Sequence, residues 1–184
     1  VHPSGEVTVF ASAHSHGQGH KTTYTQIVAD ELDVSPEEIT VVQGDTDRIP
    51  TGKGTSGSRS TVLGGNAVAR SAGDVARKAR RIAAHRLEAA ETDVVRSDGA
   101  FHLKGAPSRS VPFADVAAEA YGGDIPDGMD PGLEATTFYE ADGTAFSFGT
   151  HAAVVEVDPD TGELEILRYL AVDDCGERIN PMLV

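Results

Sequence analysis

The sequence of 184 residues lacks tryptophan, contains one cysteine and four lysines, and has only 5% aromatic residues. The single cysteine, Cys175, excludes an internal disulfide and indicates a reducing compartment, the cytoplasm. Its place at the end of an expected strand favours a small buried side chain over a catalytic thiol. No apolar stretch approaches the roughly 18 residues that cross a membrane, and no secretory signal precedes the first expected strand. These features indicate a soluble globular protein, and we expect a piece of a longer chain.

Basic residues are also few, since 29 acidic residues face 15 basic ones and give a net charge of −14. Duplex nucleic acid is therefore a poor partner, because proteins bind it by neutralising phosphates with Lys and Arg. An acidic excess with few lysines is typical of a salt-adapted cytoplasm, where dissolved ions screen the self-repulsion. An ordinary acidic bacterial protein is an equally good interpretation at this point.

Apolar periodicity and turn residues predict an α+β fold, with two-layer mixed sheets and packed helices. A strand, a helix and a second strand at the start predict a parallel pair. Alternation at Ala153, Val155 and Val157 predicts one buried face near the end. We expect two portions of one domain, 1–95 and 96–184. The expected strands are 6–11, 39–43, 93–96, 100–103, 133–139, 151–158 and 163–172, and the expected helices are 20–32, 61–90 and 113–121, with one turn at 36–38.

What the sequence does contain is two glycine-rich segments, His16–His20 and Gly52–Ser60, and each precedes a helical pattern. The first N–H groups of a helix are unpaired and the helix dipole favours negative charge there, so both segments suit a phosphate. Glycine lets the backbone approach a ligand closely. Two such segments in a small domain predict an extended, phosphate-bearing cofactor, although a tight turn and a surface loop are the simpler alternatives.

Common catalytic and nucleotide-binding motifs are absent. The second segment has neither the order of a phosphate-binding P-loop nor the spacing of a dinucleotide-binding glycine motif. No metalloprotease helix motif, nucleophile elbow or nucleophile–base pair is present, so we assign no catalytic residue. His14, His16 and His20 could suggest zinc, but no suitably placed carboxylate completes a site and we assign no metal ligand.

The motifs themselves resemble a known family. Residues 15–32, 42–47, 54–60, 151–159 and 172–181 are similar, in this order, to the molybdenum-binding large subunit of aerobic carbon monoxide dehydrogenases and their relatives. These belong to the xanthine dehydrogenase/aldehyde oxidase family of molybdenum hydroxylases. The resemblance spans nearly the whole chain, and it implies an internal part of the bilobed molybdenum-cofactor-binding domain.

The resemblance also implies roles for particular residues. The Gly-Gln-Gly turn and the following histidine would contact the molybdopterin and metal region, and the second segment would hold the pterin phosphates, often those of a cytosine dinucleotide. The cofactor-binding residues implied are Gly17, Gln18, Gly19, His20, Thr55, Gly57, Ser58 and Ser60. FAD and iron–sulfur clusters are implied in partner subunits, an FAD-binding medium subunit and an iron–sulfur small subunit, in a dimer of the complete complex.

Two elements of the family pattern are missing from this chain. The glutamate that acts as the catalytic base lies in a Gly-x-Gly-Glu segment elsewhere in such subunits, and so does the cysteine-bearing loop of the carbon monoxide enzymes. The resemblance therefore implies a cofactor-binding part that is inactive alone, within an enzyme that oxidises a small substrate with oxygen derived from water. A non-enzymatic binding module for a nucleotide or another phosphorylated ligand is the alternative.

Overall fold

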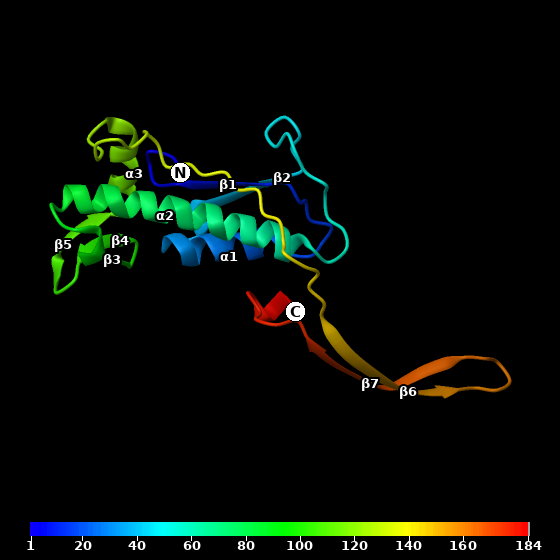
Figure 1. The fold of residues 1–184 in the computed structure, drawn as a ribbon. Helices are drawn as coiled ribbons and strands as arrows, with labels where there is room; N and C mark the ends of the chain where they lie inside the picture. Colours follow the sequence, from blue (N-terminus) through cyan, green and yellow to red (C-terminus); the bar gives the residue numbers. More distant parts are fainter. Residues whose placement is uncertain (184) are drawn as a thin grey trace. The chain divides into compact units, whose positions relative to one another are not determined.

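A computed structural model of the chain describes residues 1–183. Contacts divide these residues into two compact units, Val1–Ala141 and Asp142–Met182. All of the buried apolar residues described by the structure lie in the first unit, which contains the helices α1, α2 and α3 (Figure 1). The division at residue 95 that the sequence suggested stays a prediction about the complete domain.

The first unit opens with the expected strand–helix–strand arrangement. Strands β1 and β2 pair in parallel, with Val7 opposite Ile39 and Ala11 opposite Gln43. The single turn before β2 is capped by Glu38, whose carboxylate accepts the backbone N–H of Ser35 at 3.1 Å. The elements are β1 (Val7–Ala11), α1 (His20–Leu32), η1 (Pro36–Glu38) and β2 (Ile39–Gln43).

The long helix begins differently from the prediction of one continuous helix over 61–90. Its first turn, η2 (Ser60–Gly65), is π-helical, and the α-helix α2 then runs from Asn66 to Arg86. The wider turn coincides with a contact from α1, because the Tyr24 hydroxyl donates to the Ser60 carbonyl at 3.1 Å. Short π-helical turns are often found at functional sites.

A small antiparallel sheet follows α2, in the order β3–β4–β5. Strand β5 was not predicted, because Pro107 and Pro112 argue against a strand, but β5 is an edge strand and tolerates proline there. The predicted strand over 133–139 is wrong: this segment has no regular secondary structure. The remaining elements of the unit are η3 (Glu91–Asp93), β3 (Val94–Ser97), β4 (Ala100–Leu103), β5 (Ala106–Pro112) and α3 (Phe113–Gly122).

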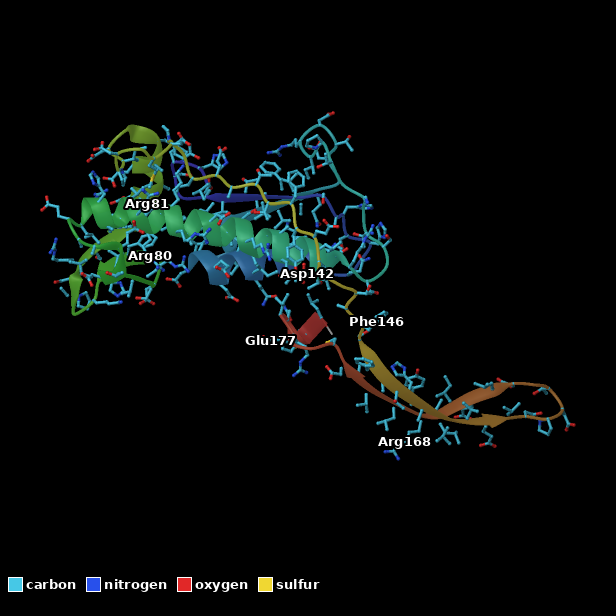
Figure 2. The ribbon with its side chains drawn as sticks, viewed as in Figure 1. Arg80, Arg81, Asp142, Phe146, Arg168 and Glu177 are labelled. Atoms are coloured by element: carbon cyan, nitrogen blue, oxygen red, sulfur yellow. The ribbon has the colours of Figure 1, made fainter. Side chains whose placement is uncertain are left out.

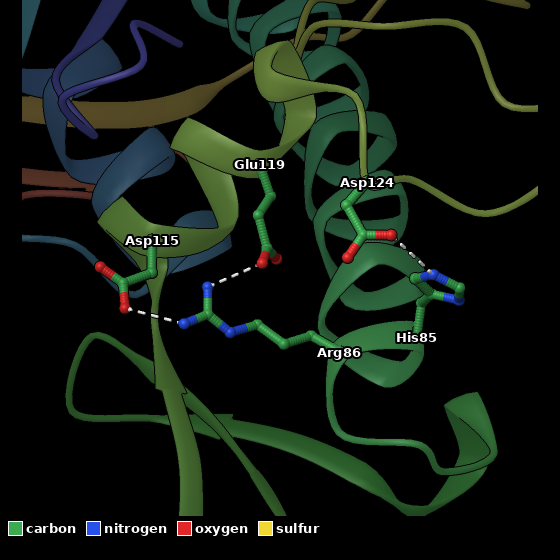
Figure 3. A network of polar contacts seen from close by, with 5 residues as sticks. All are labelled: His85, Arg86, Asp115, Glu119 and Asp124. Atoms are coloured by element: carbon green, nitrogen blue, oxygen red, sulfur yellow. Dashed lines mark hydrogen bonds and ion pairs between the residues drawn. The ribbon is translucent and has the colours of Figure 1, made fainter.

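Helices α1 and α2 pack along each other and α3 crosses the end of α2. Apolar side chains with the spacing of a helix face fill the contact. At the C-terminal end of α2, Arg86 joins two acidic residues of α3, with Nη1 2.9 Å from Glu119 and Nη2 3.5 Å from Asp115 (Figure 3). The fully buried core side chains include Tyr24, Leu32, Ala79, Ile82, Ala83, Phe101, Val116 and Leu133.

The second unit is a two-stranded ribbon of β6 (Phe148–Val157) and β7 (Leu164–Asp174), and a short turn, η4 (Pro181–Leu183), follows it. The prediction of a buried face at Ala153, Val155 and Val157 is wrong for this structure, because every residue of both strands is exposed. Cys175 is also exposed and not buried as expected. Among residues 1–183, no helix is long and apolar enough to cross a membrane.

The mixed α+β class is confirmed. Helices and small sheets share the chain, and the parallel pair β1–β2 places the two glycine-rich segments at the same end of neighbouring strands.

Candidate functional site

The second glycine-rich segment lies against Ser12 and His14, which lead from β1 into the first segment. The Thr55 hydroxyl donates a hydrogen bond to the carbonyl of His14. The backbone at Gly52 approaches Ser12 so closely that a Cβ there would lie 2.7 Å from the Ser12 Cβ. Each segment follows the carboxyl end of a strand, the first after β1 and the second after β2. Ligands of parallel α/β sheets commonly bind at these ends.

Glycine is required in the first turn by its backbone conformation. Gly17 has φ 114° and Gly19 has φ 73°, both in the left-handed region. Gly19 is the N-cap of α1, it supplies no capping side chain, and the first turn of the helix contains no acidic residue. The first N–H groups of α1 therefore lack an intrahelical acceptor, and the positive end of the helix dipole favours an anion.

The side chain of Gln18 folds back over its own turn. Its Oε1 accepts the backbone N–H of His16 and lies 3.5 Å from the Ser15 hydroxyl. The two histidines just before it also bind each other, with 2.7 Å between the Nε2 atoms of His14 and His16. These bonds fix the shape of the turn before any ligand arrives, and they leave the Gln18 amide hydrogens available as donors.

His20, the first residue of α1, is 5% exposed, and its Nδ1 has no hydrogen-bond partner among the described residues. Burial lowers the pKa of His20, and the positive charges that His16 and His14 can carry lower it further. A buried polar atom without a partner is rare in native proteins, so it indicates a missing water, ion or ligand. The ring stacks on Tyr24 at 5.7 Å between centroids.

The second turn is held from two sides. Gly57 has φ 63° and is followed by Ser58 at φ 52°, so two successive residues are left-handed. The Ser60 hydroxyl donates to Thr55 Oγ1 at 3.3 Å, and Thr55 in turn donates to the His14 carbonyl, just before the first turn. Both hydroxyl protons are thus used within the protein. Donors that remain in this segment for an anion include backbone N–H groups, the exposed hydroxyls of Ser56 and Ser58, and the side chains of Lys53 and Arg59.

The residues singled out from the sequence form two turns that follow neighbouring strands, and Thr55, held by Ser60, joins the second turn to His14 just before the first. Sequence reasoning missed Tyr24, which it placed only in an apolar stripe. Tyr24 is completely buried and its hydroxyl fixes the start of η2. The signal that could have found it is the hydroxyl itself, since a buried tyrosine needs a polar partner. No group of three or more His, Cys, Asp or Glu side chains suited to a metal lies within residues 1–183.

Comparison with known proteins decides the family. Residues 1–184 match the family described as molybdopterin cofactor-binding domain. The chain belongs to this family. Its match to a domain of oxidoreductase large subunits supports the reading as a cofactor-binding part of such a subunit over that of an unrelated binding module.

Named relatives agree with this. The chain is 44% identical over 184 residues to the carbon monoxide dehydrogenase large chain of Hydrogenophaga pseudoflava and 40% identical over 183 residues to the nicotine 6-hydroxylase large subunit of Paenarthrobacter nicotinovorans. The match to the carbon monoxide dehydrogenase includes 100% of this chain and 23% of the relative. The match to the nicotine hydroxylase includes 98% of this chain and 22% of the relative.

A solved structure has the same fold. The reconstituted CO dehydrogenase from Oligotropha carboxidovorans superposes with a TM-score of 0.91 at 40% identity, over 100% of this chain and 23% of that one. The chain thus spans about a quarter of the length of its relatives, and the molybdenum hydroxylase resemblance noted from its motifs is confirmed at the level of family.

Proposed function

We propose that the two glycine-rich turns together hold the molybdopterin cofactor. The observation that supports this most directly is the hydrogen bond from Thr55 to the His14 carbonyl, which joins the second turn to the residues that lead into the first. In this arrangement the backbone of Gly17, Gln18 and Gly19 contacts the pterin. The phosphate would receive hydrogen bonds from the backbone around Gly57 and Ser58 and from the N-terminus of α1.

The residues fit such a group. A Cβ at Gly17 or at Gly57 would meet nothing within 4 Å, so both turns have open space beside their backbone. His20 offers an unpartnered Nδ1 from a buried ring whose pKa is lowered, which favours the neutral form. A neutral Nδ1 that lacks its proton accepts a hydrogen bond, and a pterin carries N–H donors. Thr55, Ser60 and Tyr24 act behind these contacts by fixing the backbone.

The complete protein is, by this proposal, an oxidoreductase of the molybdenum hydroxylase type. When bound, the cofactor supplies redox chemistry at molybdenum that oxidises a small substrate with oxygen derived from water. This chain contributes binding and orientation, and the general base lies outside it. Relatives named for carbon monoxide and for nicotine are 44% and 40% identical to this chain over nearly its whole length, so this part of the subunit does not by itself define the substrate.

The proposal extends to the cofactor form and the partners. We propose a molybdopterin or its cytosine dinucleotide, and electron transfer to FAD and iron–sulfur clusters in a medium and a small subunit. A large subunit is the form in which several relatives are named. We further propose a cytoplasmic location, supported by the single cysteine, and adaptation to salt, supported by a net charge of −14.

Replacing Gly57 tests the binding proposal. Gly57→Ala puts a methyl group into the open space and strains a left-handed residue by about 1 to 2 kcal/mol. Gly105→Ala is the matched control, because Gly105 also has positive φ (75°) and open space but lies in the β4–β5 turn. The measurement is molybdenum by mass spectrometry, and released pterin by fluorescence, per full-length protein purified with its partners.

We expect Gly57→Ala to lower molybdenum and pterin content together, and Gly105→Ala to leave both at the wild-type value. Equal content in the two variants would contradict the proposed contact. The cofactor form is decided independently of this comparison: release of a cytosine nucleotide, identified by chromatography, indicates the cytosine dinucleotide, and its absence indicates molybdopterin alone.

A further inference from the structure

The ribbon of β6 and β7 exposes apolar side chains on both of its faces. Ten large apolar residues of the two strands are exposed, from 45% for Val155 to 73% for Phe148. Monomeric proteins rarely leave such continuous apolar surface in water, and an isolated two-stranded ribbon is at best marginally stable. All of the buried core described by the structure lies in the other unit, so the ribbon has no core of its own.

The register separates the two faces. Opposite residues in an antiparallel pair share a face, and side chains alternate along each strand. A β-bulge opposite Val154 and Val155 leaves Leu167 unpaired and interrupts this alternation, so Ile166 and Tyr169 share a face. Val155 lies opposite Ile166 and Val157 opposite Leu164, whereas Glu156 lies opposite Glu165 between them. We call the first the apolar face, made of Ala153, Val155, Val157, Leu164, Ile166 and Tyr169, and the second the mixed face, made of Phe148, Val154, Glu156, Glu165, Arg168, Leu170 and Val172.

Polar groups on the apolar face already have partners. The Tyr169 hydroxyl lies 2.9 Å from His151 Nδ1, and His151 Nε2 lies 3.2 Å from Asp173 Oδ1. A Cβ at Gly149 would collide with the Asp173 carboxylate, so glycine makes room for this chain of contacts. A partner on the apolar face therefore needs only apolar contacts, because the polar atoms at its edge satisfy one another.

Charges on the mixed face do not balance in the same way. Glu156 and Glu165 are direct cross-strand neighbours, and like charges in this position are destabilising. Among the residues that the structure describes, neither forms an ion pair with Arg168, whose side chain points away from the ribbon (Figure 2). The segment that covers this face is therefore expected to bring a Lys or Arg to the two carboxylates.

We propose that both faces are covered by other segments of the same polypeptide, and that the segment on the mixed face is basic. This inference rests on the proposed function, because the longer subunit is inferred from relatives of which the chain covers 23%. Strands buried on both faces are rich in Val, Ile and Leu, as β6 and β7 are. A second copy in a two-fold dimer contacts one patch of each subunit, so it would leave the other face in water.

Thiol labelling of the full-length protein in its native complex tests the proposal. The background is Cys175→Ser, and its remaining reactive cysteines are counted first. Single cysteines are then introduced at Ile166 on the apolar face and at Val154 on the mixed face. Asp160, in the β6–β7 turn, is the control position. The rate of reaction with a maleimide is compared with the rate in urea. Molybdenum and pterin content are measured on the same samples, so that loss of cofactor is recognised separately from exposure of the ribbon.

We expect Ile166→Cys and Val154→Cys to react at least about tenfold more slowly in native protein than in urea. This protection should be the same at every protein concentration, and it should persist in the large subunit separated from its partners. Asp160→Cys should react at nearly the same rate in native protein and in urea. Rapid native labelling at either face overturns the proposal. Protection that falls on dilution indicates a second copy, and protection lost with the partners indicates another subunit; both overturn it too. A variant that fails to assemble is replaced by Ile166→Val and Ile166→Ala, and unchanged thermal stability in both also overturns it.

Discussion

The contact between Tyr24 and the π-helical turn yields a prediction that can be worked out from the geometry. Tyr24 is completely buried and donates to the Ser60 carbonyl. An ideal Cβ on Gly64 would lie against the Tyr24 hydroxyl, closer than real Cβ atoms approach, whereas the next atom, the ring Cζ, would be 3.3 Å away. The hydroxyl therefore both stabilises the turn and excludes any side chain at position 64.

Each single change should destabilise the turn. Tyr24→Phe removes one buried hydrogen bond and costs about 1 to 2 kcal/mol, toward the low end if the Ser60 carbonyl keeps another donor. Gly64→Ala overpacks the contact at about 1 to 3 kcal/mol, offset by roughly 1 kcal/mol of helix propensity. In the Tyr24→Phe background the steric conflict is gone and only the gain in helix propensity remains, so Gly64→Ala should stabilise the turn by up to about 1 kcal/mol. The coupling free energy equals the steric cost that disappears, about 1 to 3 kcal/mol.

Hydrogen exchange of the full-length protein measures this coupling locally, as the opening free energy of amides in α1 and η2. Gly73→Ala in α2 is the control, because the nearest atom to its Cβ would be 3.7 Å away. It should stabilise α2 by up to about 1 kcal/mol, equally with Tyr24 or Phe at position 24. Additivity of Tyr24→Phe and Gly64→Ala within about 0.3 kcal/mol would refute the reasoning.

Two further predictions concern charge. The pKa of His20 is lowered in the folded state, so as the pH falls the unfolded chain binds this proton first. The free energy of unfolding should therefore decrease as the pH drops below about 6.5. His20→Gln should remove this part of the pH dependence, measured by urea unfolding at several pH values. An unchanged slope would contradict the burial argument. Arg86→Gln breaks the exposed contacts to Glu119 and Asp115 and should lower the free energy of unfolding by only about 0.5 to 1 kcal/mol, and by less in 1 M salt. Thermal unfolding at low and high salt measures this. A loss of stability that does not depend on salt would indicate lost packing instead.

Local sequence patterns predicted most elements of the first unit because these elements are stabilised by residues close to them in the sequence. The α1 stripe of Tyr24, Val28 and Leu32 has helical spacing, and the Ser35 turn has its own capping residues. The β5 strand was missed because it depends on pairing with β4, a contact between segments that no local pattern of its two prolines reveals. The segment 133–139 was taken for a strand from its residue types, but no strand pairs with it, only Leu133 is buried, and Phe138 is 83% exposed.

The candidate site was predictable in part for the same reason. Glycines at 17, 19 and 57 mark turns that need left-handed backbone, and this is visible in the sequence. The contact between the second segment and the residues that lead into the first is a tertiary contact, which depends on the parallel pairing of β1 with β2. The hydrogen bond from the Thr55 hydroxyl to the His14 carbonyl forms only in this arrangement, so the sequence alone does not reveal it. The ribbon was misjudged because alternation predicts a face suited to burial, whereas every residue of β6 and β7 is exposed in this structure.

Exchange of the backbone amides in the two turns, compared between the full-length protein with its cofactor and the same protein prepared without it, examines the main conclusion most directly. Cofactor should slow exchange at 16–22 and at 55–60 together, while the β4–β5 turn around Gly105 stays unchanged. Protection confined to one turn, or absent from both in protein that contains stoichiometric molybdenum, would contradict the account.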